Sequence, residues 1–282
     1  MKPVFALLFF LSAIRTYSHP GVGLVMDSRG NVYFTDLKQV WRLDPTGKKT
    51  VAVPHVHTHE LYLDEKDNLY GEHLWYNGEK ADTWGHYVWK LSAEGKFEKI
   101  IPDTEGFLKD FGFVHDGQGL MYWPDRETDC QKVIRKNADG SRTKLGDQCL
   151  KNIRWLTAGR DGTVYLTDFH DLKKIDVRGH VTTLVENMPD KKLSVLFVNE
   201  DHYLSGIYTD QADNIYVSDY SGRQVKKVTP SGKVSVVTET NLPWSPAATL
   251  VAPNGDFWVL ENSLTNAVRV EKITPDGQRI IY

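Results

Sequence analysis

The sequence predicts an all-β protein, a six-bladed β-propeller whose blades are four-stranded antiparallel sheets. A phrase recurs six times: an apolar strand, an Asp-containing turn, Gly or Asn, and an apolar-aromatic strand. Its clearest copies are Gly21–Asp36 and Leu204–Asp219. Two further strand-like segments joined by a Pro, Asp or Gly turn follow each copy, as in QVKKVTPSGKVSVVT. Four short strands in each of six repeats are typical of a propeller.

The repeats predict one propeller domain over residues 19–282, with blades at approximately 21–53, 59–102, 111–146, 153–188, 204–239 and 245–282. No window of ten or more residues keeps a helical period without Gly, Pro or a β-branched run. Blade one begins with its innermost strand and blade six ends with its outermost. We therefore expect the ring to close by packing between blades, without a terminal strand that completes another blade.

The segments GNVYFTD, DNIYVSDYSGRQVKKVTPSGKV and VRVEKITPDGQ carry a resemblance to a known family. In them the chain resembles the NHL-repeat six-bladed β-propellers and is distantly similar to the gluconolactonase-like (senescence-marker-like) superfamily. The resemblance covers nearly all of the chain after about Gly21 and implies the fold. It does not imply one activity, since such propellers include lactonases, lyases and pure binding modules.

Residues 1–18 combine a basic start at Lys2 with an apolar run too short to span a bilayer, which predicts a signal peptide. The expected protein is secreted or periplasmic, monomeric, and without a membrane segment after cleavage. A retained anchor or a buried strand is the alternative. The net charge of -3 gives no reason to expect nucleic acid as a partner.

Cys130 and Cys149 are the only two cysteines of the chain. Cys130 follows the second strand of blade three, and Cys149 precedes the first strand of blade four, so both belong to the same face of the propeller. An exported chain permits a disulfide between them. The alternative is two unpaired thiols.

Histidines gather on the face formed by the loops before each first strand and after each second strand. In PHVHTHE, His55, His57 and His59 alternate, and alternate residues of an extended chain share a side. Glu60 follows directly. GEH at the end of the next strand places Glu72 and His73 at the same rim.

These residue types suit two chemistries. Imidazole and carboxylate groups bind zinc, copper or iron, so His57, His59, Glu72 and His73 are the candidate ligands of a divalent transition metal. His59 and Glu60 are the candidates for acid–base catalysis near neutral pH. The alternative is a hydrogen-bonded polar rim that holds no metal.

A calcium site of the lactonase kind is not expected. In gluconolactonase-like propellers, one position before the core of each first strand supplies the Glu, Asn and Asp residues that bind calcium. The corresponding positions in this chain are Val22, His59, Phe111, Arg154, Ser205 and Ala247. A hard cation needs several oxygen ligands, and these residues supply few.

Four residues are candidates for ligand binding. Arg154 could hold a carboxylate or phosphate through two parallel hydrogen bonds, and Trp155 follows it. Trp75 and Tyr76 lie in the longest loop after a second strand, where aromatic rings offer flat surfaces to sugars or planar ligands. For Arg154 the alternative is an ion pair with a neighbouring acid, and for the aromatic residues it is local packing.

The repeated Asp27, Asp64, Asp116 and Asp210 share one place in the turn between the first two strands, so we interpret them as turn formers. The sequence thus predicts a hydrolase or lyase acting on a small polar or anionic ligand at a histidine-rich channel mouth. The alternative is a non-catalytic module that binds a glycan, peptide or protein, and whether the protein is an enzyme is left open.

Overall fold

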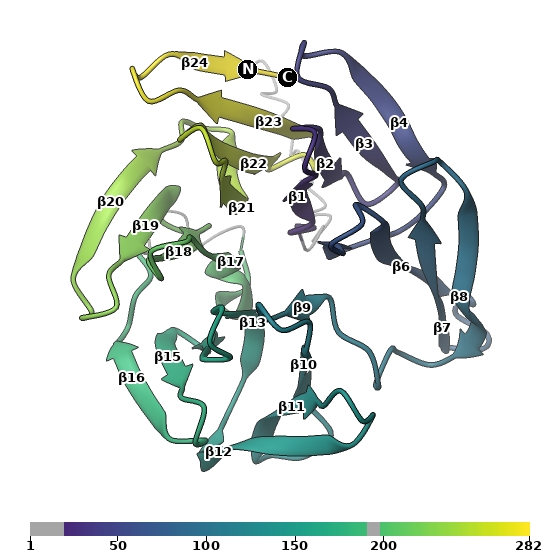
Figure 1. The fold of residues 1–282 in the computed structure, drawn as a ribbon, viewed down its shortest axis with the longest axis vertical. Coiled ribbons are helices and arrows are strands. Elements are labelled where there is room, and N and C mark those ends of the chain that lie inside the picture. Colours follow the sequence, from purple (N-terminus) through teal and green to yellow (C-terminus); the bar gives the residue numbers. More distant parts are fainter. Residues whose placement is uncertain (1–19, 191–197) are drawn as a thin grey trace, which may run out of the picture.

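The computed structural model describes residues 20–190 and 198–282, which form six four-stranded antiparallel sheets arranged in a ring (Figure 1). Each sheet contains four consecutive strands in chain order, and the first strand of each faces the centre of the ring. This confirms the predicted all-β, six-bladed propeller. Within residues 20–190 and 198–282, every blade is built from four consecutive strands, and no strand from one end of the chain pairs with a blade at the other end.

The first three blades lie close to their expected ranges. Blade one contains β1 (Leu24–Met26), β2 (Val32–Thr35), β3 (Gln39–Leu43) and β4 (Lys49–Pro54). Blade two contains β5 (Leu61–Leu63), β6 (Leu69–Tyr76), β7 (Trp84–Leu91) and β8 (Phe97–Glu105). Blade three contains β9 (Val114–His115), β10 (Met121–Asp125), β11 (Gln131–Lys136) and β12 (Arg142–Leu150).

The last three blades follow the same plan. Blade four contains β13 (Ile153–Ala158), β14 (Val164–Asp168), β15 (Asp171–Ile175) and β16 (Val181–Val185). A 3-10 turn (Glu200–His202) precedes blade five, which contains β17 (Leu204–Thr209), β18 (Ile215–Asp219), β19 (Gln224–Val228) and β20 (Val234–Glu239). Blade six contains β21 (Trp244–Val251), β22 (Phe257–Ser263), β23 (Val268–Ile273) and β24 (Arg279–Ile281).

The predicted signal peptide, residues 1–18, lies outside the described residues. Within residues 20–190 and 198–282, no helix is long and apolar enough to cross a membrane.

The repeated aspartates form the turns between the first two strands of their blades, as predicted. In blade two, one oxygen of Asp64 accepts hydrogen bonds from the backbone N–H groups of Lys66 and Asn68, both at 2.9 Å. Its other oxygen accepts the hydroxyl of Tyr70 at 2.9 Å. The same bonds, to residues two, four and six positions further on, recur at Asp27, Asp116 and Asp210. These four carboxylates therefore stabilise the turns between the first two strands of their blades.

Hydrophobic clusters seal five of the six junctions between neighbouring blades. Representative pairs of residues across these junctions are Phe34 with Leu260, Val40 with Leu69, Val133 with Ile153, Leu172 with Ile215, and Val225 with Val259. Among the described residues no such cluster joins blade two to blade three. A contiguous apolar contact is the usual means of joining two blades, so this junction is held differently.

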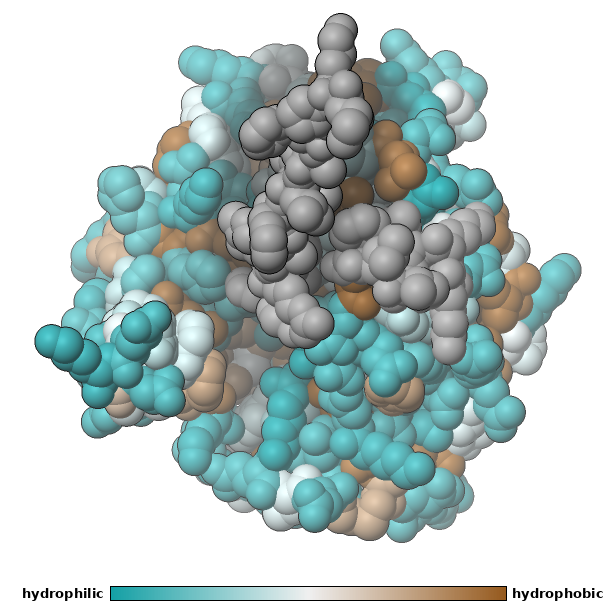
Figure 2. All heavy atoms as spheres, turned by 180° about the vertical axis from the view of Figure 1, so that it is seen from behind, coloured by the Kyte–Doolittle hydropathy of each residue, from teal (hydrophilic) through white to brown (hydrophobic). Residues whose placement is uncertain are grey.

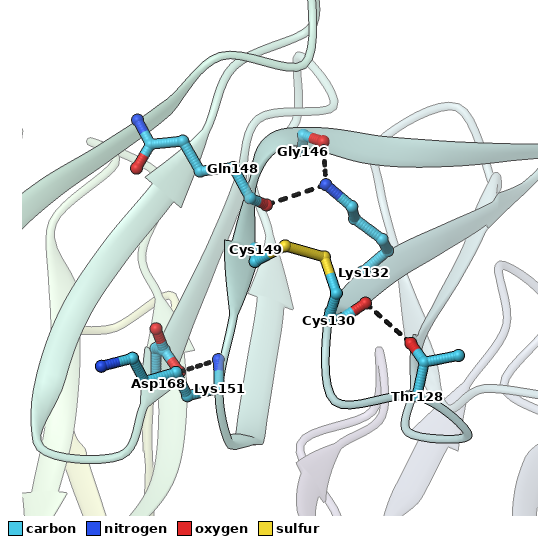
Figure 3. Close-up of a disulfide and its surroundings, with 8 residues drawn as sticks. All are labelled: Thr128, Cys130, Lys132, Gly146, Gln148, Cys149, Lys151 and Asp168. Atoms are coloured by element: carbon cyan, nitrogen blue, oxygen red, sulfur yellow. Dashed lines mark hydrogen bonds between the residues drawn. A yellow bond between two sulfur atoms is a disulfide. The ribbon is translucent and has the colours of Figure 1, made fainter.

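A disulfide links Cys130 to Cys149, as predicted (Figure 3). It joins the loop after β10 to the end of β12 and encloses the hairpin of β11 and β12. Beside it, the Lys132 ammonium donates to the carbonyl oxygens of Gly146 and Gln148 at 2.8 and 2.9 Å (Figure 3). The two strands are thus tied together at the end that faces blade four.

Replacing both cysteines by serine should lower the free energy of unfolding by about 3 kcal/mol, because a cross-link of this loop length restricts the unfolded chain. The loss should appear in urea unfolding curves of the parent and the double variant. Thiol titration of the unfolded, unreduced parent is the control. Two reactive thiols there would contradict the disulfide.

Candidate functional site

The first strands of all six blades line a central cavity of about 520 Å³. Its walls are mainly apolar, with Leu61, Phe113, Leu156 and Leu250 among them, and its far end reaches the turn at Asp27. This volume falls within the range of small-molecule pockets. The channel is therefore large enough to admit a small molecule.

A second cavity of about 1,040 Å³ occupies the junction of blades two and three, where the hydrophobic cluster is missing. We call it the interblade groove. In Figure 2 the outline of the molecule is indented at the lower left, between these two blades. Five residues line both the channel and the groove, namely Glu60, Phe113, Val114, Trp155 and Leu156. The two cavities therefore meet at Glu60.

Glu60 is the most strongly perturbed carboxyl group of this site. Protein surrounds it, although it keeps partial contact with solvent through the cavities that it lines. Its pKa is raised to about 7, mainly by burial and also by the nearby Glu72 carboxylate, whereas Arg126 and His59 oppose the rise. A carboxyl group with a pKa near the working pH can both give and take a proton.

His59 and Glu72 form a pair at the inner end of the groove. The Nδ1 atom of His59 lies 3.2 Å from Oε1 of Glu72, and both residues line the groove. The strands hold this pair firmly, because the carbonyl oxygen of Glu72 accepts hydrogen bonds from the Thr58 hydroxyl and, at 2.9 Å, from the Trp89 indole. The contact fixes the orientation of the imidazole next to Glu60.

His57 and His73 lie beside this pair but have other partners. The His57 ring contacts the His59 ring edge-on at 4.7 Å between centroids. The backbone N–H of His57 donates to Nδ1 of His73 at 2.8 Å, so the His73 proton belongs on Nε2. Burial lowers the pKa of His73. Its ring packs against Tyr87 and Trp75, at 4.9 and 5.7 Å.

The four predicted metal ligands therefore do not converge on one point. In the described part of the chain, no group of three or more His, Cys, Asp or Glu side chains is placed to hold a metal ion. The Nδ1 atom of His73 is already a hydrogen-bond acceptor, and that ring packs against Tyr87 and Trp75. Any step through zinc, copper or iron would need a rearrangement of these side chains.

Two arginines line the groove opposite the carboxylates. The Arg126 guanidinium donates to the carbonyl oxygens of Ile153 and Arg154 at 3.0 and 2.9 Å. The Arg154 guanidinium lies 2.7 Å from Nε2 of His202. Burial lowers the pKa of both arginines. No carboxylate of the described residues lies within ion-pair distance of either guanidinium. Arg154 is half-buried and Arg126 is more exposed. Two such cations, with no ion-paired carboxylate among the described residues, form a favourable site for a carboxylate.

The predicted aromatic residues separate into different environments. Trp155 lines both cavities next to Glu60. Trp75 packs over Gly85 and donates its indole N–H to Asn77 at 3.0 Å, so it contributes to local packing. Tyr76 is exposed and contacts the Trp84 ring at 5.1 Å. Neither Trp75 nor Tyr76 lines the groove.

Arg126 is the main residue of the site that the sequence analysis missed. It directly follows β10, the second strand of blade three, and so obeys the same rule that placed His73 at the rim. His202, the partner of Arg154, belongs to the turn before β17. The positions of both residues in the repeat, after a second strand and before a first strand, could have indicated them.

The raised pKa of Glu60 predicts how stability depends on pH. The folded protein binds its proton up to about pH 7, whereas an unfolded Glu releases it near 4.5. The free energy of unfolding should therefore fall as pH rises from 5 to 8, by at most roughly 3 kcal/mol from this group. Glu60→Gln should remove that fall.

Urea unfolding of the parent, Glu60→Gln and the exposed control Glu65→Gln at pH 5 and pH 8 measures this effect. Glu65→Gln should follow the parent. A stability difference between Glu60→Gln and the parent that stays constant with pH would show that the Glu60 pKa is not raised.

The metal ligands stay a prediction that elemental analysis can test. Because the donors do not converge, we expect purified parent protein to carry well under one zinc, copper or iron per chain. A folded His57→Ala/His59→Ala variant is the comparison. Near-stoichiometric metal in the parent and none in the variant would restore the metal site.

No protein-family model matches the chain, and no curated protein matches it. Solved structures do. A streptogramin B lyase is 17% identical, with 93% of this chain and 82% of that chain covered and a TM-score of 0.54. Virginiamycin B lyase from Staphylococcus aureus is 14% identical, with 93% and 84% covered and a TM-score of 0.53.

A gluconolactonase from Xanthomonas campestris is 13% identical, with 88% of this chain and 84% of that chain covered and a TM-score of 0.60. Identities this low bear on the fold and leave the activity open. The chain has the six-bladed propeller fold of the gluconolactonase-like proteins and the streptogramin lyases.

Proposed function

We propose that this protein is an acid–base enzyme, a lyase or hydrolase, that binds a small carboxylate in the interblade groove and moves a proton through Glu60. One observation carries the proposal: a carboxyl group with a pKa of about 7 lies where two cavities meet, beside two arginines that have no carboxylate of the described residues within ion-pair distance. Perturbed carboxyl groups in cavities are candidates for proton transfer.

The arginines suit the binding step. Arg126 and Arg154 are held by β13 and by His202, so their positions are set before a ligand arrives. A carboxylate bound between them would satisfy both cations. Such charge-assisted hydrogen bonds also stabilise the extra negative charge that develops when a neighbouring C–H bond loses its proton.

Elimination is the reaction that uses all of these groups. Glu60, as the carboxylate, takes the proton from the carbon next to the bound carboxylate. The electron pair of that C–H bond forms a double bond to the next carbon, and the leaving group departs with its own bonding pair. The His59–Glu72 pair orients the imidazole that flanks Glu60. The lyases among the structural neighbours are in keeping with this chemistry.

Screening small carboxylates for the ultraviolet absorbance of an unsaturated product tests the proposal. With a substrate in hand, Glu60→Gln should lower kcat by a factor on the order of 100 to 10,000 while binding persists. Arg154→Gln should lower kcat/KM by a factor on the order of 100. The exposed Arg160→Gln is the matched control. A Glu60→Gln variant with parental kcat would rule out the proton-transfer role.

A binding module is the second candidate. Three neighbouring rings at the rim, those of Tyr76, Trp84 and Phe107, are exposed, and such surfaces also occur in proteins that only capture ligands. Tight ligand binding by the parent with no turnover, unchanged in Glu60→Gln, would favour this candidate over the enzyme.

A further inference from the structure

An aromatic row leads from the rim into the interblade groove. The rings of Tyr76 and Trp84 lie 5.1 Å apart, and those of Trp84 and Phe107 lie 5.4 Å apart. These side chains are 42%, 37% and 55% exposed. Phe107 itself lines the groove, and further in the rings of Phe111 and Phe113 are in contact at 5.3 Å.

The aromatic row contributes little to the core of the propeller. None of Tyr76, Trp84 and Phe107 belongs to the hydrophobic clusters that join the blades. Contiguous exposed rings on a rigid β-scaffold are a mark of an interaction surface. Their continuity with the groove indicates a ligand longer than one small carboxylate.

The charges of the groove change along its length. Away from Glu60, the basic residues are neutralised by ion pairs: Lys109 with Glu127 at 2.7 Å, Arg142 with Asp110 at 2.7 Å, and Lys144 with Asp125 at 2.9 Å. At the inner end, Arg126 and Arg154 have no such ion pair with any described residue. The matching ligand is uncharged along most of its length and anionic at one end.

We propose that the groove binds an oligosaccharide of neutral sugars that ends in a single acidic sugar. The carboxylate of that sugar occupies the arginine pair, so the inference rests on the proposed function for this end of the ligand. The following sugars place their C–H faces on the aromatic rings. Their hydroxyl groups hydrogen-bond to the ion pairs along the wall formed by blade three. A ligand with a charge on every unit would not fit the neutral part of the groove.

Trp84→Ala/Phe107→Ala is the variant that separates the row from the arginine pair. Both side chains are exposed, so the fold should persist, and thermal unfolding of the variant confirms that it does. Phe97→Ala removes an exposed ring at the first residue of β8, at the opposite end of this strand from Phe107, and is the matched control. A glycan array and calorimetry then compare glucuronic acid, neutral oligosaccharides, and the same oligosaccharides ending in one glucuronic acid.

The parent should bind an oligosaccharide ending in glucuronic acid about tenfold or more tightly than glucuronic acid alone. Trp84→Ala/Phe107→Ala should lose this gain and keep the affinity for the monosaccharide, while Phe97→Ala should match the parent. Arg154→Gln should lose both ligands.

Equal affinity for the monosaccharide and the longer chains would overturn the oligosaccharide inference and leave the proposed carboxylate site intact. Preference for a hexaglutamate peptide over every glycan would overturn it in favour of an acidic peptide. Binding of no carboxylate ligand at all would overturn the proposed function as well.

Discussion

The candidate site depends on one contact that the described residues do not make, a hydrophobic cluster of the kind that joins the blades at the other five junctions. In a ring of similar blades, each junction would normally bury the apolar faces of two sheets. Between blades two and three, that space is the interblade groove. The gap lets ligand reach Glu60 from the side of the ring, in addition to the central channel.

An open junction needs other restraints, and blade three carries several of them. The disulfide ties the loop that contains Arg126 to the segment that leads into β13, which carries Arg154. Arg126 adds hydrogen bonds to two carbonyl oxygens of β13. The cross-link therefore stabilises the hairpin and also limits the relative movement of the two arginines. Holding binding groups on a rigid scaffold is what makes a site selective.

The sequence was sufficient for the fold because the signal was repeated six times, and an error in one blade is corrected by the other five. It also selected five residues from the first strands, the segments before them and the second strands, and all five line the groove: His59, Glu60, Glu72, Arg154 and Trp155. Arg126 directly follows a second strand, so its place in the repeat could have predicted it as well.

The distance of His73, Trp75 and Tyr76 from the groove has a physical cause. β6 continues as a regular strand through Tyr76, so its side chains alternate between two faces. Glu72 and Leu74 face the groove, whereas His73 and Trp75 face Tyr87. Treating residues 72–76 as one rim placed both faces in the same site. The open junction itself could not be predicted, because it depends on how side chains of two separate repeats pack.

The position of Glu60 explains why one residue can combine properties that normally exclude each other. The apolar wall of the channel, with Leu61 and Phe113, disfavours its charged form and raises its pKa. The groove side supplies the two arginines of the proposed anion site, and Arg126 opposes that rise. A carboxyl group wholly in the channel would stay protonated and out of reach of a polar ligand. One wholly in the groove would form an ion pair with the arginines and occupy the anion site itself. Only at the meeting point of the two cavities does the carboxyl group titrate near neutral pH while the arginines remain available.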